Sequence, residues 1–252
     1  MRSIIAIPAR VNSKRLPRKI LSDIGGKPMI KHVLDKCMEA KNNADLILCT
    51  DDVDLMNLSK EWGYKPIFTN KKCSSGTERI ASVLDEIKGE DNLKNILVIN
   101  VQGDQPFIDP CIIENLIDIF NSSNPNYDIL TPVYKLSPES IHNPNIVKVL
   151  RSSEGEAIYF SRSALPHVRD VNPHQWHKYC NYWGHVGIYG YRGDILKKWF
   201  GLKKSKLENL EKLEQLRFIE AGIKINTFIV KDTTLSIDTR EQLDFARSIY
   251  KG

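Results

Sequence analysis

Short apolar segments that alternate with amphipathic ones are the feature of this chain that most constrains its fold. Four runs rich in Ile, Leu and Val read as strands buried on both faces, at residues 3–9, 44–50, 95–101 and 128–134. Four segments with apolar residues at helical spacing lie between them, at 27–40, 51–62, 76–88 and 109–121. This alternation predicts an open, mostly parallel α/β sheet, in which ligands bind at the carboxyl ends of the strands.

The remainder of the chain departs from this alternation. Residues 130–200 are rich in Pro, Asn, Tyr, His and Trp, which favours an inserted lobe of antiparallel strands and loops. Residues 205–221 predict one long helix, with a candidate N-cap at Ser205 and leucines on one face at Leu207, Leu210, Leu213 and Leu216. A strand at 224–230 and a closing helix at 240–251 follow. We therefore expect a single domain over 1–252, in which a mixed, mostly parallel sheet carries a smaller antiparallel lobe at about 130–200.

Charge and cysteine usage exclude several classes of protein. The net charge of +5 suits acidic ligands but is too small to indicate nucleic-acid binding by itself. The five cysteines are scattered without a CxxC spacing, as is typical of reduced thiols in an intracellular protein. No apolar run approaches the roughly 20 residues of a membrane span, and the first residues lack the pattern of a secretory signal. We expect a cytoplasmic protein.

A basic loop follows the first predicted strand. The stretch IPARVNSKRLPRK at 7–19 has no acidic residue and brings together Arg10, Arg15, Arg18 and Lys19. Phosphate oxygens favour charge-assisted donors, so this loop is suited to a polyphosphate. It matches neither the Walker A pattern nor the GxGxxG turn. A targeting peptide is disfavoured because the basic stretch follows a predicted strand and contains two prolines. A nucleic-acid-binding patch and a solvated basic loop stay open as alternative interpretations.

Two aspartates follow short apolar runs elsewhere in the chain. ILVINVQGD ends in Asp104 and LSIDT contains Asp238. Either residue could instead be a helix N-cap. Mg²⁺ prefers one or two carboxylates together with phosphate oxygens and water. Two strand-end carboxylates and a basic loop are the minimal set for metal-assisted nucleotidyl transfer, so we favour a Mg²⁺ site at Asp104 and Asp238.

An ordered series of motifs resembles a known family. The series is PARxxSxRLPxK, GGKPMI, SGTER, NVQGDQP, NPNIVKV, YFSRSALP, HVGIYGYR, LEKLEQLR and SIDT, and it runs from about residue 3 to the last helix. It resembles the 3-deoxy-manno-octulosonate (KDO) cytidylyltransferases. The first motif is shared with other sugar cytidylyltransferases, including the sialic acid enzymes, whereas HVGIYGYR with LEKLEQLR is more specific to the KDO branch.

The resemblance implies a nucleotide-diphospho-sugar transferase fold of Rossmann-like type and a homodimer. It also implies the transfer of CMP from CTP to KDO with Mg²⁺, for lipopolysaccharide biosynthesis. The catalytic set implied by the resemblance is Arg10, Lys19, Asp104 and Asp238, of which Asp104 and Asp238 would bind the metal. The implied nucleotide-binding set is Pro8, Ala9, Arg10, Arg15, Lys19, Ser75, Gly76 and Arg79. The implied sugar-binding set is Gln102, Arg162, His185, Tyr189, Glu214 and Gln215.

Two departures from the family pattern bear on the sugar. Gln105 stands where the pattern has Glu after QGD, and Gly184 stands where an arginine often precedes the histidine of HVGIYGYR. Neither departure replaces a residue of the basic loop or one of the two aspartates. The departures therefore leave an 8-amino-KDO analogue or another acidic sugar, such as a sialic-type acid, open as the substrate. His174 and His177 have a spacing that a zinc site could use, but no third ligand is evident. A nucleic-acid-binding protein and a catalytically inactive relative are the remaining alternatives.

Overall fold

The computed structural model describes residues 1–12, 16–40, 44–122, 127–231 and 236–250, which form two compact units. The first unit comprises 1–122, 190–199 and 234–252, and the second comprises 123–189 and 200–233. The second unit overlaps the lobe predicted at 130–200 and also takes in the segment that follows it. That the whole chain acts as one cytidylyltransferase domain stays a prediction.

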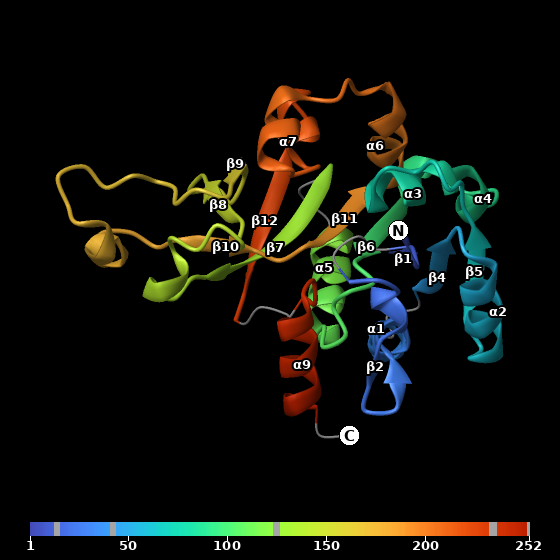
Figure 1. The fold of residues 1–252 in the computed structure, drawn as a ribbon. Coiled ribbons are helices and arrows are strands. Elements are labelled where there is room, and N and C mark those ends of the chain that lie inside the picture. Colours follow the sequence, from blue (N-terminus) through green and yellow to red (C-terminus); the bar gives the residue numbers. More distant parts are fainter. Residues whose placement is uncertain (13–15, 41–43, 123–126, 232–235, 251–252) are drawn as a thin grey trace. The chain divides into compact units, whose positions relative to one another are not determined.

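A parallel sheet forms the centre of the first unit (Figure 1). Its strands are β1 (Arg2–Ala9), β4 (Asp45–Thr50), β5 (Lys65–Phe68) and β6 (Ile96–Val101), in the order β5-β4-β1-β6, with β11 (Ile188–Arg192) next to β6. Ile5 pairs in register with Leu46 on one side and Ile99 on the other. Every residue of β6, and every residue of β1 after Arg2, is buried. The predicted mostly parallel α/β sheet is therefore confirmed, and its apolar runs are continuous because both faces are covered.

Helices alternate with these strands as the periodicity predicts. They are α1 (Met29–Glu39), α2 (Val53–Glu61), α3 (Gly76–Ser82), α4 (Leu84–Lys88), α5 (Pro110–Asn121), α6 (Gly193–Lys197) and α9 (Arg240–Ile249). Asp52 and Asp109 cap α2 and α5, because their carboxylates accept hydrogen bonds from the first helical N–H groups. The segment predicted as one helix at 76–88 instead forms α3 and α4, which join at Val83.

Short elements complete the first unit. The hairpin of β2 (Asp23–Ile24) and β3 (Lys27–Pro28) turns at Gly25 and Gly26, whose φ angles of 60° and 85° favour glycine. Single turns of 3₁₀ helix are η1 (Lys19–Leu21) and η2 (Leu93–Asn95), and η5 (Lys198–Gly201) follows α6.

Antiparallel pairing dominates the second unit. Its strands are β7 (Ile129–Lys135), β8 (Lys148–Arg151), β9 (Ala157–Ser161), β10 (Trp183–His185) and β12 (Ile225–Val230), in the order β12-β7-β10-β8-β9. β10 is antiparallel to β7 and β8, and β8 is antiparallel to β9, whereas β12 is parallel to β7. The remaining elements are η3 (Pro138–Ser140), η4 (Pro173–Lys178), α7 (Lys206–Glu211) and α8 (Leu216–Glu220). The predicted antiparallel lobe is thus present.

The long helix predicted over 205–221 is wrong. Ser205 does cap a helix, through a capping box with Glu208, but the helix ends at Glu211, and its C-cap Lys212 has a left-handed φ of 57°. Leu213 is buried whereas Leu210 is 79% exposed, so the leucines do not share one buried face. The Glu211 carbonyl accepts a hydrogen bond from Arg162 Nε at 2.9 Å. Tertiary contacts therefore override a favourable local pattern here. Among the described residues, no helix is long and apolar enough to cross a membrane.

Candidate active site

Lys19 and two aspartates form a charged cluster in the first unit. Lys19 Nζ donates hydrogen bonds to Asp104 Oδ2 at 2.7 Å and to Asp238 Oδ1 at 2.8 Å. The lysine side chain is 12% exposed, and the two aspartates are 24% and 34% exposed. Three of the four residues of the predicted catalytic set are thus brought together at the end of the basic loop, whereas the fourth, Arg10, lines the pocket described below.

Close backbone approach brings these segments together. A Cβ atom added at Gly103 would lie 3.3 Å from the Pro8 carbonyl oxygen, so glycine lets the loop that carries Asp104 approach the end of β1. The Ile237 N–H donates to the Asp104 carbonyl at 2.9 Å. That bond fixes Asp238, the next residue, beside the Asp104 loop.

The electrostatics of the cluster favour a charged lysine. Burial opposes the charged form of Lys19 more than any other single effect, but attraction to Asp104 and the hydrogen bonds to Asp104 and Asp238 outweigh it and raise the pKa of Lys19. Lys19 is therefore an ammonium at neutral pH. It supplies a fixed positive charge and partly neutralises the two carboxylates.

The donor set of the cluster fits a Mg²⁺ ion. Mg²⁺ is commonly held by one or two carboxylates, with water and substrate phosphates completing its coordination. Asp104 and Asp238 are partly exposed and converge on one cation, the Lys19 ammonium. Two carboxylates that share the lysine as a partner can also bind a divalent cation, provided that the lysine side chain moves away or turns toward a phosphate.

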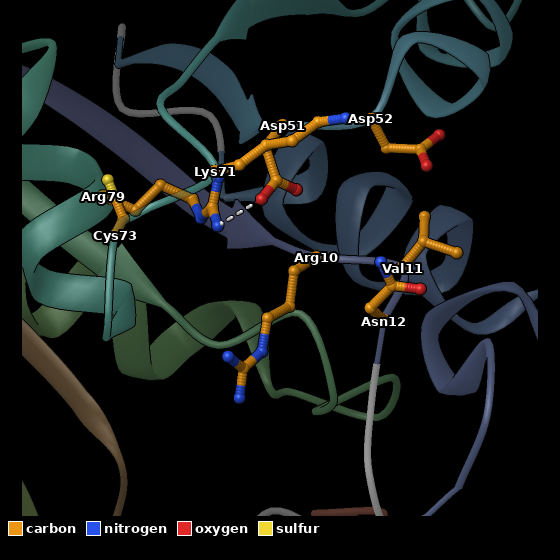
Figure 2. Close-up of a pocket in the computed structure, with 8 residues that line it drawn as sticks. All are labelled: Arg10, Val11, Asn12, Asp51, Asp52, Lys71, Cys73 and Arg79. Atoms are coloured by element: carbon orange, nitrogen blue, oxygen red, sulfur yellow. Dashed lines mark hydrogen bonds and ion pairs between the residues drawn. The ribbon is translucent and has the colours of Figure 1, made fainter.

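A pocket of about 200 Å³ lies beside the end of β1 (Figure 2). Its lining residues come from the ends of β1, β4 and β5 and from α3, and they are Arg10, Val11, Asn12, Asp51, Asp52, Lys71, Cys73 and Arg79. Two residues of the predicted nucleotide-binding set, Arg10 and Arg79, thus line one pocket. Arg15 lies outside the described residues.

Arg79 is held in a fixed position at this pocket. It is 3% exposed and donates to Thr69 Oγ1 and, at 3.0 Å, to Asp51 Oδ2. Figure 2 shows the ion pair with Asp51 at the pocket wall. Because these acceptors fix its guanidinium, Arg79 contributes shape and a preset charge to the pocket.

The other predicted nucleotide-binding residues surround the start of α3 and the end of β1. Ser75 caps α3, and its hydroxyl accepts from the Glu78 N–H at 3.2 Å. A Cβ atom added at Gly76 would lie 3.0 Å from Pro8 Cγ and 3.4 Å from Gln102 Oε1, so any larger residue would crowd this junction. Pro8 and Ala9 are buried at the end of β1. Gln102, assigned to the sugar, therefore lies beside residues assigned to the nucleotide.

Five residues of the predicted sugar-binding set lie in the second unit, where His185 and Tyr189 are neighbours. Their ring centroids are 5.1 Å apart. Thr131 Oγ1 lies 2.7 Å from the Ile188 carbonyl and 3.0 Å from His185 Nε2. Its single proton goes to the carbonyl, so we assign the proton of His185 to Nε2, which leaves Nδ1 as an acceptor. Burial lowers the pKa of His185 to about 3, so the ring is neutral at physiological pH.

Arg162 is held by backbone acceptors in the same unit. Its Nε donates to the Glu211 carbonyl at 2.9 Å and its Nη1 donates to the Pro144 carbonyl at 3.2 Å. The Glu211 carboxylate in turn accepts from the Arg162 N–H at 2.9 Å and from Ser161 Oγ at 2.6 Å. These bonds fix the plane of the guanidinium. Of the two remaining predicted residues, Gln215 is buried just before α8 and Glu214 is half-buried beside it.

Lys148 is a buried charged residue that sequence analysis did not single out. It has no exposed surface, and its Nζ donates to the carbonyls of Asn143 and Ile146 at 2.8 Å and 2.6 Å. Burial, and to a smaller extent the charge of Arg162, lower its pKa, while Glu211 opposes the shift. Lys148 thus fixes the loop whose Pro144 carbonyl contacts Arg162.

The two departures from the family pattern have structural counterparts. Gly184 packs so closely that an added Cβ atom would lie 2.6 Å from the Tyr134 ring and 2.7 Å from Leu136 Cδ2, so no larger residue fits without repacking. Gln105 is 4% exposed, and its Oε1 has no hydrogen-bond partner among the described residues. Gly184 therefore leaves no room for a larger side chain, and Gln105 places an amide oxygen in a buried position.

Sequence analysis missed several pocket residues. Asp51 and Asp52 directly follow a buried strand, which is the same signal that identifies Asp104. Lys71 and Cys73 lie in an irregular segment without a motif. Only the fold reveals that they line the pocket.

Comparisons with known proteins show which family this chain resembles. The family model described as cytidylyltransferase matches residues 4–225. The 3-deoxy-manno-octulosonate cytidylyltransferase of Thermodesulfovibrio yellowstonii is 38% identical over 248 residues, which cover 98% of this chain and 97% of that relative. Among solved structures, CMP:2-keto-3-deoxy-manno-octonic acid synthetase complexed with CTP has a TM-score of 0.89 and 36% identity, covering 99% of this chain and 98% of that one. A cytidylyltransferase from Leptospira borgpetersenii, at 15% identity and a TM-score of 0.63 over 100% of this chain and 89% of that one, shares the fold.

Proposed function

Because the chain belongs to the 3-deoxy-manno-octulosonate cytidylyltransferase family, we propose that it transfers CMP from CTP to the anomeric hydroxyl of KDO and releases diphosphate. The product would supply lipopolysaccharide biosynthesis. The observation that carries the proposal is the cluster in which Lys19 bridges Asp104 and Asp238 at the end of the basic loop. An ammonium beside two carboxylates suits the transfer of a phosphoryl group that needs both cationic charge and a metal.

The reaction needs positioning and charge stabilisation rather than a protein nucleophile. The anomeric oxygen forms a bond to the α-phosphorus, and the bond from that phosphorus to the oxygen bridging to the β-phosphate breaks. The bridging oxygen leaves with diphosphate, and the hydroxyl proton passes to solvent water. Arg10 and Lys19 would neutralise charge that builds on the phosphate oxygens. Asp104 and Asp238 would hold Mg²⁺, which when bound supplies Lewis-acid stabilisation of the phosphates.

The pocket beside β1 would take the cytidine part of CTP. It combines the cations Arg10, Lys71 and Arg79 with the acids Asp51 and Asp52. Fixed donors and acceptors of both signs suit a pyrimidine base with a carbonyl and an amino group. Ser75 and Gly76 lie at the start of the helix that carries Arg79.

The sugar would be recognised by residues of the second unit. The fixed fork of Arg162 matches a carboxylate. The acceptor Nδ1 of His185 suits a sugar hydroxyl. Tyr189, Glu214 and Gln215 complete the proposed set. The buried amide of Gln105 and the tight packing of Gly184 keep an 8-amino analogue and other acidic sugars as alternatives to KDO.

We also propose that the enzyme is a cytoplasmic homodimer. Ile158 on the edge strand β9 is 53% exposed, and Tyr179, which directly follows η4, is 63% exposed. Exposed apolar side chains of this kind are suited to an interface between subunits. Light scattering coupled to size-exclusion chromatography gives the mass in solution, and a monomer at micromolar concentration would refute the dimer.

The function is tested by diphosphate release from CTP and Mg²⁺, with KDO, its 8-amino analogue and a sialic acid offered in parallel. We expect release with KDO and none with sialic acid. Asp104→Asn should abolish turnover while CTP still binds weakly. Release with only the amino analogue would identify that analogue as the sugar substrate and would still support cytidylyl transfer. Release with none of the sugars, or full activity of Asp104→Asn, would contradict the proposal.

A further inference from the structure

The ring of Tyr250 fills a space that a side chain at Gly25 would need. A Cβ atom added at Gly25 would lie 2.1 Å from Tyr250 Cε1 and 2.2 Å from Tyr250 Cδ1. The same ring stacks on Phe107, with centroids 6.3 Å apart, and meets the edge of His32, with centroids 5.0 Å apart. One aromatic ring therefore contacts the β2–β3 hairpin, helix α1 and the loop that follows β6.

The segments that meet at this ring also carry the charged cluster. Lys19 begins the turn that leads into the β2–β3 hairpin, which carries Gly25. Asp104 lies three residues before Phe107, and Asp238 lies immediately before Thr239, the N-cap of α9, which Tyr250 follows. Lys19 and Asp104 thus lie six and three residues in sequence from Gly25 and Phe107, which contact the ring, whereas Asp238 lies at the opposite end of α9 from Tyr250.

An apolar cluster packs between the segments that contact Tyr250 and includes Ile237, the neighbour of Asp238. Ile24, Met29, Ile237, Leu243 and Ala246 form a buried cluster. Partly buried residues pack against it, namely Leu16, Phe107 and Tyr250. In addition, Arg247 Nε donates to the Asp23 carbonyl at 2.9 Å, so α9 is tied to the hairpin by a hydrogen bond as well.

The charged cluster tolerates little displacement. Both of its contacts are hydrogen bonds of 2.7–2.8 Å. Misplacing a reacting or binding group by about 1 Å can cost roughly 100-fold in rate. Asp238 belongs to the segment that leads into α9, and α9 contacts the rest of the first unit through the packing just described.

We propose that Tyr250 is a positioning residue whose ring holds Lys19, Asp104 and Asp238 in register for the metal and the triphosphate. The inference rests on the proposed function and adds to it a residue outside the nucleotide, sugar and metal sets. The contacts that define this role are made by the ring. A phenylalanine at this position should therefore keep the charged cluster in place, and an alanine should not.

The test compares Tyr250→Ala with Tyr250→Phe and with Phe245→Ala as a matched control. Phe245 is an aromatic residue of the same helix and is 56% exposed. Three quantities are measured: binding of Mn²⁺ without CTP by electron paramagnetic resonance, kcat and KM for CTP and for the sugar, and the melting temperature. All assays are run well below the melting temperature of each variant.

We expect Tyr250→Ala to weaken Mn²⁺ binding at least about fivefold and to lower kcat at least about tenfold, with the KM for the sugar unchanged. Tyr250→Phe and Phe245→Ala should stay within about twofold of the wild type. If Tyr250→Ala does not fold, Tyr250→Leu, which keeps apolar volume, is used instead. We expect it to weaken Mn²⁺ binding and lower kcat in the same direction, by smaller factors.

A folded Tyr250→Ala or Tyr250→Leu with Mn²⁺ binding and kcat within about twofold of the wild type would overturn the inference, even if its melting temperature fell. A loss in Tyr250→Phe equal to that in Tyr250→Ala would also overturn it, because the hydroxyl would then be responsible. Failure of the proposed function looks different: the wild type would release no diphosphate with any sugar, while Mn²⁺ binding still reported on the cluster.

Discussion

Replacing Lys19 by methionine should change metal binding and catalysis in opposite directions. Methionine keeps an unbranched side chain but removes the ammonium that lies 2.7 Å from Asp104 Oδ2 and 2.8 Å from Asp238 Oδ1. A divalent ion that binds the same carboxylates lies near that ammonium and is repelled by it. Without the ammonium, the two carboxylates offer their full negative charge to the ion.

The expected size of this effect follows from Coulomb's law. Charges of +1 and +2 held roughly 4 Å apart repel by about 2 kcal/mol even at the dielectric constant of water. That free energy corresponds to roughly a 30-fold change in affinity. Lys19→Met should therefore bind Mn²⁺ about 10- to 30-fold more tightly than the wild type in the absence of CTP. Its kcat should fall about 100-fold or more, because a cation that stabilises the phosphates in the transition state is gone.

The assay is titration of free Mn²⁺ by electron paramagnetic resonance at fixed, low ionic strength, since salt screens the repulsion. Lys36→Met is the control, because Lys36 is an exposed lysine on α1 that pairs with Glu39 rather than with the cluster. Asp104→Asn added to Lys19→Met should abolish the gain. Unchanged or weaker Mn²⁺ binding by Lys19→Met would refute the assignment of these carboxylates as metal ligands.

Three further predictions concern the pocket and the second unit. Arg162→Ala should raise the KM for the sugar at least about tenfold and leave the KM for CTP within about twofold. Initial rates measure both, with Arg169→Ala, a change at an exposed arginine, as the control. Equal effects on both substrates would exclude that Arg162 binds the sugar carboxylate. Asp51→Asn should raise the KM for CTP about tenfold, because Arg79 loses the charged acceptor that fixes it, and an unaltered KM would show that the pocket does not depend on this ion pair. Since the pKa of His185 in the folded state, about 3, lies below that of free histidine, the unfolded state binds more protons between about pH 3 and 6.5 and stability falls as the pH falls through that window. From pH 7.5 to 5 the wild type should therefore lose about 1–2 kcal/mol more unfolding free energy than His185→Gln, measured by urea titration, and parallel losses would contradict a buried neutral imidazole.

Much of the candidate site was predictable because its signals are local. The charge of the basic loop, the buried strand before it and the aspartate after the strand at 96–101 each appear within a few residues of sequence. The carboxyl ends of parallel strands meet at one edge of a sheet, so placing Lys19 and Asp104 on the same edge needed only the alternation of strands and helices. The pocket acids Asp51 and Asp52 carry the same signal and could have been found in the same way.

Other features depend on contacts that no local pattern contains. The leucine spacing over 205–221 favours a long helix, but Arg162 takes the Glu211 carbonyl and the chain turns at Lys212. Lys148 looks like an ordinary strand lysine until the fold buries it against two carbonyls. In both cases tertiary hydrogen bonds outweigh local preference, which amounts to less than about 1 kcal/mol per residue for most residue types.

By itself, the sequence predicted the mostly parallel α/β fold and the antiparallel lobe, because periodicity acts over short stretches of chain, and its ordered motifs identified the family. That the first loop binds a polyphosphate stays a prediction. Only the tertiary structure decided that Lys19 bridges two aspartates 85 and 219 positions away. It also decided that Thr131 Oγ1 lies near both the Ile188 carbonyl and His185 Nε2, and that Tyr250 packs on Gly25 and contacts segments that carry the charged cluster. These outcomes depend on how closely distant segments pack, and a difference of about 1 Å in that packing separates a formed cluster from a broken one.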